Sequence, residues 1–244
     1  MLLTPFLGLC FPRTASFCSS AAYTSPTMRW QTSTTPGYMQ NIIIYTGSTT
    51  DIQHYEGLGI SGSVVMTLLA PYLKKGHILF VDNWYSSPTL FQHLLSLDTG
   101  ACGTVRANRK GMPTFTSKMT KDQVECRENG TQLAVKWHDK RDVHLLTTVH
   151  PSTMSATGKV DHITKGRKMK PLCVQEYNKK MGAVDKADMM KGFFDCTRKT
   201  TKWYKKVFLY LLDTAILNSH IVHHQLTGEK FAYQIKNNIE FTYK

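Results

Sequence analysis

The chain has 244 residues, 41% hydrophobic and 19% charged, a composition that excludes a disordered chain and collagen-like or coiled-coil repeats. Thirty Lys and Arg residues against 17 Asp and Glu residues give a net charge of +13. Residues 1–100 hold four basic and four acidic residues, so all of the net positive charge falls in residues 101–244. A field of this sign attracts polyanions, either nucleic acid or an anionic membrane face, although a basic protein without such a ligand can have the same composition. No apolar run reaches the length of a transmembrane helix, so we predict no membrane span.

The first forty residues differ from the rest of the chain. They are rich in Ser, Thr and Pro, and the first acidic residue is Asp51. Arg13 and Arg29 among hydroxyl side chains faintly resemble a mitochondrial presequence, and a non-native start is the other interpretation. We predict that residues 1–40 are an atypical, disordered segment.

Residues 41–107 alternate between strand and helix patterns. Apolar, β-branched runs predict strands, and apolar residues at helical spacing predict helices. Ser86-Ser87-Pro88 supplies an N-cap and a proline at the first helical position. The predicted elements are a strand at 41–46, a helix at 61–73, a strand at 77–81, a helix at 88–97 and a strand at 101–107. This order is typical of an α/β layer with largely parallel strands.

The remaining residues form two regions and a tail. Residues 108–172 are basic and rich in turns, with two predicted strands at 131–137 and 143–149, so we interpret them as a β-rich insertion. Residues 173–228 return to a helical pattern, while 229–244 are weakly defined. Within the helical region, one face is predicted to collect Val207, Phe208, Leu211, Leu212, Ala215, Ile216 and Val222.

Two acidic positions are candidates for chemistry. Asp82 ends an apolar strand, where α/β folds place ligand sites, but it could equally be a turn residue. Asp185 and Asp188 are three residues apart, on one face if helical, and acids are also common at a helix start. Carboxylates brought together from separate segments can bind Mg²⁺ or Mn²⁺ for phosphoryl transfer, yet spacing alone does not show that Asp82 and Asp185 converge.

Basic residues interleaved with aromatic ones are candidates for nucleic-acid contact. Cations neutralise phosphates and aromatic rings stack on bases, although an ordinary basic helix start has the same pattern. The predicted nucleic-acid-binding residues are Arg106, Arg109, Lys110, Arg198, Lys199, Lys202 and Trp203.

Six segments, in this order, resemble piggyBac transposases and the host proteins derived from them. Together they span roughly residues 41–228. They are Tyr45–Gly47, Gly76–Pro88, Gly100–Pro113, Trp137–Val143 with Leu146–His150, Tyr177–Asp185, and Arg198–Trp203 leading into Leu211–Asn218.

The resemblance implies a ribonuclease-H-like core that carries a β-rich insertion. The family cuts and rejoins DNA at TTAA sites with three aspartates and two divalent metals, Mg²⁺ or Mn²⁺. Asp82 corresponds to the second catalytic and metal-binding aspartate and Asp185 to the third. DNA bound through residues 101–244, a nuclear location and a possible homodimer are implied as well.

The departures from the family pattern decide the predicted activity. In the family the first aspartate stands on the first core strand, before the segment that matches Tyr45–Gly47, and no acidic residue occurs there in this sequence. We therefore predict an incomplete core that lacks its first two strands, in an N- and C-terminally truncated protein without the zinc-binding module. The predicted function is residual DNA binding without catalysis. The alternatives are an active metal-dependent transposase or endonuclease whose missing aspartate comes from elsewhere, and a gene remnant without activity.

Overall fold

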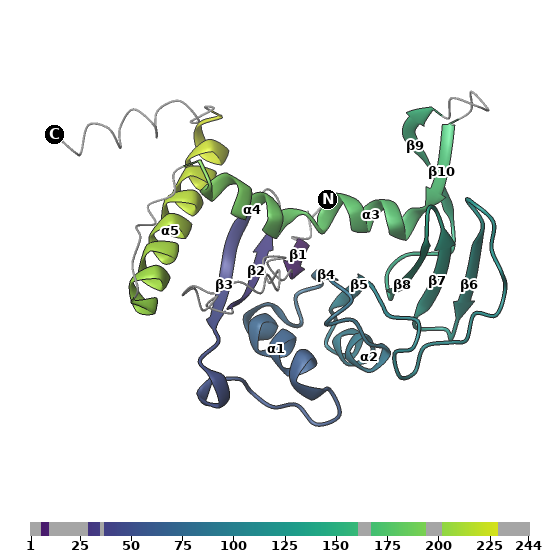
Figure 1. The fold of residues 1–244 in the computed structure, drawn as a ribbon, viewed down its shortest axis with the longest axis horizontal. Coiled ribbons are helices and arrows are strands. Elements are labelled where there is room, and N and C mark those ends of the chain that lie inside the picture. Colours follow the sequence, from purple (N-terminus) through teal and green to yellow (C-terminus); the bar gives the residue numbers. More distant parts are fainter. Residues whose placement is uncertain (1–5, 10–28, 35–36, 161–166, 194–201, 229–244) are drawn as a thin grey trace, which may run out of the picture. The chain divides into compact units, whose positions relative to one another are not determined.

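The computed structural model describes residues 6–9, 29–34, 37–160, 167–193 and 202–228. The chain divides into two compact units. Unit 1 comprises residues 1–10 and 51–182, and unit 2 comprises residues 11–50 and 183–244. Figure 1 labels the helices and strands of both units.

Unit 1 is built on a mixed sheet whose strands follow the order β1-β4-β5-β8-β7-β6. Strands β1 (Phe6–Leu9), β4 (Ile78–Val81) and β5 (Gly100–Thr104) are parallel. Strands β8 (Asp142–Thr147), β7 (Leu133–His138) and β6 (Val124–Glu128) continue the sheet with antiparallel pairing. Strands β9 (Met154–Val160) and β10 (Arg167–Pro171) form a separate antiparallel pair.

Helices of unit 1 pack on both sides of the sheet (Figure 1). Strand β4 is preceded by helix α1 (Gly59–Leu69) and the 3₁₀ turn η2 (Ala70–Tyr72). Helix α2 (Pro88–Ser96) lies between β4 and β5 in the sequence. Helix α3 (Leu172–Lys180) lies on the other side from α2. Because side chains alternate along a strand, Phe80 and Cys102 point toward α3, where Cys173 and Val174 complete an apolar core with Trp137.

Unit 2 contains a hairpin and two helices. Strands β2 (Arg29–Thr34) and β3 (Tyr38–Ile44) pair antiparallel, and the 3₁₀ turn η1 (Gly47–Thr49) follows them. Helices α4 (Ala183–Lys191) and α5 (Trp203–Thr227) pack against the hairpin. The small core of this unit joins Met39, Ala187, Leu217 and Ile221.

The structure contains two strands, β1 and β2, in the segment where the prediction expected none. Strand β1 pairs with β4, placing Phe6 beside Ile78 and Leu9 beside Val81, and β2 pairs with β3. Both strands lie within residues 1–40, which the sequence analysis predicted to be disordered. Strands as short as β1 gain their backbone hydrogen bonds from a neighbouring strand, so a four-residue segment gives little signal of its own.

Other elements agree with the predictions in kind and differ in extent. Strands β4, β5, β7 and β8 and helix α2 fall within three residues of their predicted bounds, whereas α1 ends four residues earlier than predicted and is followed by η2. Strands β6, β9 and β10 were not predicted, and the described part of the helical region holds three helices. In α5 the buried residues are Asp213, Thr214, Leu217 and Ile221, so most of the predicted apolar face is not the core face. No helix among the described residues combines the length and the apolar character that crossing a bilayer requires.

Candidate nucleic-acid interface

Asp82 directly follows β4, at the carboxyl end of the parallel strands of unit 1. Its carbonyl oxygen accepts hydrogen bonds from the backbone N–H groups of Tyr85 (3.1 Å) and Ser86 (3.2 Å), which closes a tight turn. The Ser87 hydroxyl then accepts a hydrogen bond from the N–H of Leu90 at 3.2 Å and caps α2, as the Ser-Ser-Pro sequence predicts. The backbone on both sides of Asp82 is therefore held in place.

The Asp82 carboxylate is half-buried and contacts hydrogen-bond donors of its own unit. Its Oδ1 accepts from the backbone N–H of Asn83 at 2.6 Å and from the Thr104 hydroxyl at 3.4 Å. The same Thr104 hydroxyl lies 3.2 Å from the Tyr177 hydroxyl of α3. A line of polar groups thus runs from the end of β4 across β5 to α3, at the edge where open α/β sheets bind ligands.

A close approach of backbones at Gly103 permits this arrangement. A Cβ atom on Gly103 would lie 2.5 Å from the Val81 carbonyl oxygen and would also collide with the Ser86 hydroxyl. Both neighbours are fully buried, so neither has room to move. Glycine at this position lets β4, β5 and the Asp82 turn come together.

Two arginines on the loop after β5 pack against the Asp82 turn. Arg109 Nη2 donates hydrogen bonds to the carbonyl oxygens of Asn83 (2.6 Å) and Trp84 (3.2 Å). The guanidinium carbon of Arg106 lies 5.8 Å from the centre of the Trp84 ring, within the range of a cation–π contact. Burial, together with the neighbouring charge of Arg106, lowers the pKa of Arg109 below its ordinary value. The structure thereby places two cations and an exposed indole beside Asp82.

The same cluster contains surface that a ligand can reach. Trp84 is 51% exposed, and Arg106 and Lys110 are exposed, while Arg109 is half-buried. Of the seven predicted nucleic-acid-binding residues, Arg106, Arg109 and Lys110 thus share one loop beside Asp82. Trp84 was missed by the sequence analysis, although an aromatic residue in a turn after a strand was a usable signal.

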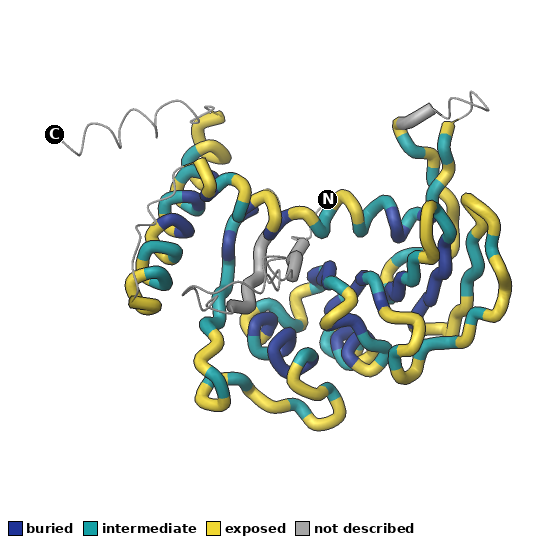
Figure 2. The backbone as a smooth tube through the Cα atoms, viewed as in Figure 1, coloured by how far each residue is buried: buried dark blue, intermediate teal, exposed yellow. Residues whose placement is uncertain are grey.

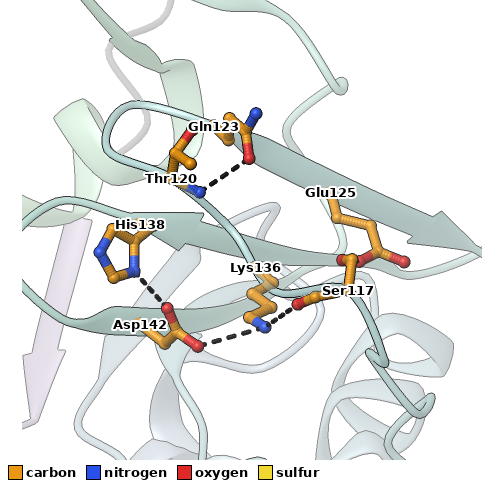
Figure 3. Close-up of polar contacts among 7 residues, drawn as sticks. All are labelled: Ser117, Thr120, Gln123, Glu125, Lys136, His138 and Asp142. Atoms are coloured by element: carbon orange, nitrogen blue, oxygen red, sulfur yellow. Dashed lines mark hydrogen bonds and ion pairs between the residues drawn. The ribbon is translucent and has the colours of Figure 1, made fainter.

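The far end of this loop is tied to the β7–β8 hairpin (Figure 3). Lys136 is buried, and its ammonium group donates to the carbonyl oxygen of Ser117 at 3.0 Å and pairs with Asp142 at 3.1 Å. The other Asp142 oxygen lies 2.5 Å from His138 Nδ1. Hydrogen bonds from His138, and then from Lys136, lower the pKa of Asp142. The loop that carries Arg106 and Arg109 is therefore anchored at both ends.

Asp185 lies in unit 2, in the first turn of α4, and it is exposed. A negative charge at this position is stabilised by the positive end of the helix. Asp188, three residues later, lies 2.8 Å from the buried ammonium group of Lys191, which also donates to the Tyr210 hydroxyl at 2.7 Å. The predicted pair of carboxylates on one helix face is therefore divided between a surface position and an ion pair.

The described residues do not fit a metal site made of three carboxylates. Among them no group of three His, Cys, Asp or Glu side chains lies close enough together to hold a metal ion. The Asp82 carboxylate accepts hydrogen bonds from a backbone N–H and a hydroxyl. Strand β1, which lies beside β4, has the sequence Phe-Leu-Gly-Leu and supplies no carboxylate.

Two of the remaining predicted residues, Lys202 and Trp203, stand at the start of α5. Lys202 and Trp203 are exposed, with Trp203 packing edge-on against Tyr204 at 6.3 Å between ring centres. Arg198 and Lys199 lie outside the described residues. These positions belong to unit 2, whereas Arg106, Arg109 and Lys110 belong to unit 1.

Comparison with known proteins decides the family. A family model described as "Transposase IS4" matches residues 20–220, which is most of the chain. The chain is 23% identical over 210 residues to human PiggyBac transposable element-derived protein 3, covering 80% of this chain and 35% of that protein. It is 22% identical over 181 residues to human PiggyBac transposable element-derived protein 2, covering 69% and 31% respectively. The chain belongs to the piggyBac transposase family.

The fold of this piggyBac family member agrees with that assignment. A solved piggyBac transposase, determined as a synaptic complex with hairpin DNA, superposes with a TM-score of 0.69 at 21% identity. The match covers 93% of this chain and 48% of the transposase chain. The shared fold is ribonuclease-H-like, with a mixed α/β sheet, as the sequence resemblance implied. The chain spans about a third of the length of the two human relatives.

Proposed function

We propose that this piggyBac family member binds double-stranded DNA without cutting it. The observation that carries the proposal is the cluster of Arg106 and Arg109 against the exposed Trp84, at the carboxyl ends of β4 and β5. Arginines held in a fixed position beside an aromatic ring suit phosphate contact and stacking better than freely moving surface lysines do.

The residues of the cluster have different roles in the proposed binding. Arg109 Nη2 donates hydrogen bonds to two backbone carbonyl oxygens, so Arg109 holds the Asn83–Trp84 turn in position. Arg106 and Lys110 are exposed and are the groups that would reach phosphates. We favour DNA over an anionic membrane as the ligand, because a related transposase is known in a complex with DNA. A role on chromosomal DNA carries with it the nuclear location that the sequence analysis predicted.

Lack of catalysis is the second half of the proposal. Hydrolysis and strand transfer by two metal ions need carboxylates that converge on both ions. Asp82 directly follows β4, but the adjacent strand β1 has no acidic residue. Asp82 is held by Asn83 and Thr104 as part of the turn that presents Trp84. Its role in this proposal is therefore structural.

The DNA-binding half is tested by measuring affinity for a fluorescently labelled duplex over a series of salt concentrations. For a contact that neutralises one phosphate, the slope of log K against log salt falls by about 0.9 when the cation is removed. We expect Arg106→Gln with Lys110→Gln to reduce the slope by about 2. Lys75→Gln is the matched control, because this exposed lysine precedes β4, at the opposite end of the strand from Asp82. An unchanged slope in the double variant, or an equal change in the control, would refute the assigned contact.

The catalytic half is tested separately with Mg²⁺ or Mn²⁺ and TTAA-containing DNA. We expect neither strand cleavage nor strand transfer by the unmodified chain at concentrations that saturate the duplex. Cleavage that disappears in Asp82→Ala, in a variant that still binds DNA, would overturn the proposal and support the metal-dependent nuclease instead.

A further inference from the structure

The loop between β6 and β7 turns through an Asn-Gly pair, Asn129 and Gly130. The Asn129 N–H donates to the Gln132 carbonyl oxygen at 3.2 Å and closes the loop. Gly130 has a φ of 85°, in the left-handed region that glycine adopts without strain. The chain is exposed from residue 127 to residue 131, as the colours of Figure 2 show, so water reaches both residues of the pair.

The Asn129 carboxamide accepts hydrogen bonds from donors of its own loop. Its Oδ1 accepts from the N–H of Gln132 at 2.8 Å and from the N–H of Thr131 at 3.2 Å. The Thr131 hydroxyl also donates to Oδ1 at 3.2 Å, and it shares this hydrogen with Gln92 Oε1 of α2 at 3.0 Å. These donors point to the atom that becomes negatively charged when a nucleophile attacks the carboxamide carbon Cγ.

The nucleophile nearest in the chain is the backbone nitrogen of Gly130, because a bond from this nitrogen to Asn129 Cγ closes a succinimide ring. A side chain on the residue after an asparagine hinders that approach, and Asn129 is the only asparagine in the sequence that precedes a glycine. A Cβ atom on Gly130 would meet nothing within 4 Å beyond its two chain neighbours. No other described part of the chain therefore crowds the glycine.

We propose that Asn129 is a site of self-catalysed modification, at which the carboxamide is converted to isoaspartate or aspartate and ammonia is released. Hydroxide removes the amide proton of Gly130, and the nitrogen bonds to Asn129 Cγ while the carbonyl electron pair moves onto Oδ1. The carbonyl then re-forms, the bond from Cγ to the side-chain nitrogen breaks, and this nitrogen leaves as ammonia with a proton from water. Water finally adds to either carbonyl of the succinimide and opens the ring.

The folded loop assists this reaction through the donors around Oδ1. They are already in place before the attack, and they stabilise the negative charge that the attack creates, as the donors of an oxyanion hole do. The Thr131 hydroxyl is the side-chain member of the set and is divided between Oδ1 and Gln92. The rate at Asn129 should therefore depend on Thr131 and on Gln92 in opposite directions.

The modification changes a loop that is tied to α2. Thr131 donates to Gln92, and the buried Gln132 donates from Nε2 to the Pro88 carbonyl oxygen at 2.9 Å. Isoaspartate adds a methylene group to the backbone between these contacts and the end of β6, whereas aspartate leaves the backbone length unchanged. Both products lower the net charge by one, so ion exchange separates them from the unmodified chain. The inference is independent of the DNA contacts assigned to Arg106 and Lys110.

Ageing of the full chain at neutral pH, followed by tryptic mass spectrometry of residues 128–136, tests the reaction. We expect faster conversion at Asn129 than at Asn108, which is exposed in the same unit but precedes an arginine. Thr131→Val should slow conversion by about two- to tenfold, the effect of losing one hydrogen bond. The matched control Thr116→Val, at another exposed threonine of unit 1, should leave the rate unchanged. Equal rates at Asn129 and Asn108, or in Thr131→Val and the unmodified chain, would overturn the proposal.

Two further measurements separate assistance by the loop from damage to the fold. Gln92→Ala, at an exposed helix position, leaves the Thr131 hydroxyl to Asn129 alone and should speed conversion. In synthetic peptides of residues 128–136, which lack the folded loop, Thr131→Val should have no effect on the rate. A slower reaction in Gln92→Ala, or an equal effect of Thr131→Val in peptide and folded chain, would refute the role of the donors.

The structural consequence is measured on the isoaspartate fraction after ion exchange. Its urea midpoint should lie below that of Asn129→Asp, the matched control that carries the charge without the added methylene group. Equal midpoints would show that the loop absorbs the longer backbone and would contradict the assigned tie between this loop and α2.

Discussion

Replacing Gly103 by alanine tests whether the approach of β4, β5 and the Asp82 turn is as tight as the structure shows. The added methyl group would lie 2.5 Å from the Val81 carbonyl oxygen and 2.9 Å from Val81 Cγ2, and would overlap the Ser86 hydroxyl. Overpacking of a rigid core costs about 1–3 kcal/mol. The obstacle here includes backbone in the centre of a sheet, so we expect a loss near the upper end, about 3 kcal/mol.

The measurement is urea unfolding followed by tryptophan fluorescence. Gly158→Ala in β9 is the matched control, because a Cβ atom there meets no other atom within 4 Å. Its free energy of unfolding should change by less than about 0.5 kcal/mol. Gly103→Ala should also weaken DNA binding, since the turn it displaces presents Trp84. Equal urea midpoints for the two variants would refute the reasoning about Gly103.

Three further predictions concern stability. Asn218→Ala removes both hydrogen bonds from this side chain to the β3 backbone, at 2.9 and 2.7 Å, and should cost about 1–3 kcal/mol in urea unfolding; an unchanged midpoint would contradict it. Lys136→Met removes the buried partner of Asp142 and should release the Arg106 loop, measured as faster proteolysis of that loop; unchanged cleavage would show that other contacts hold it. Burial raises the pKa of Cys173 to about 12 and that of Cys102 higher still, from an ordinary 9.0. These thiols stay protonated in the folded chain while unfolded thiols ionise. The free energy of unfolding should therefore fall as pH rises from 9 toward 12, more steeply than in Cys173→Ala.

The sequence was most informative where local chemistry determines structure. The Ser-Ser-Pro cap fixed the start of α2, and the apolar run before Asp82 identified β4. Strands β1 and β2 were missed, because their hydrogen bonds come from neighbours distant in sequence. In α5 helical spacing identified a helix correctly, but it could not show which of two apolar faces lies in the core.

For the candidate site, the sequence identified residue types and missed their partners. Arg106, Arg109 and Lys110 were predicted from charge alone, and the structure adds that Arg109 binds the backbone of the Asp82 turn. Trp84 and Tyr177 could not be assigned to the site, because only the folded sheet brings them to the end of β4. Whether Asp82 and Asp185 act together stays a prediction.

The Asn218 side chain hydrogen-bonds to β3 in the way that a peptide group of a neighbouring strand would. Its amide accepts from the Met39 N–H and donates to the Met39 carbonyl, so it reproduces the pattern that one more strand would offer to β3. β3 ends the order of its sheet, and such edges are templates on which foreign strands can add and begin fibrils. A single carboxamide projecting from α5 thus occupies the N–H and the carbonyl of Met39, so an added strand would have to displace Asn218 before it could pair with β3 at this position.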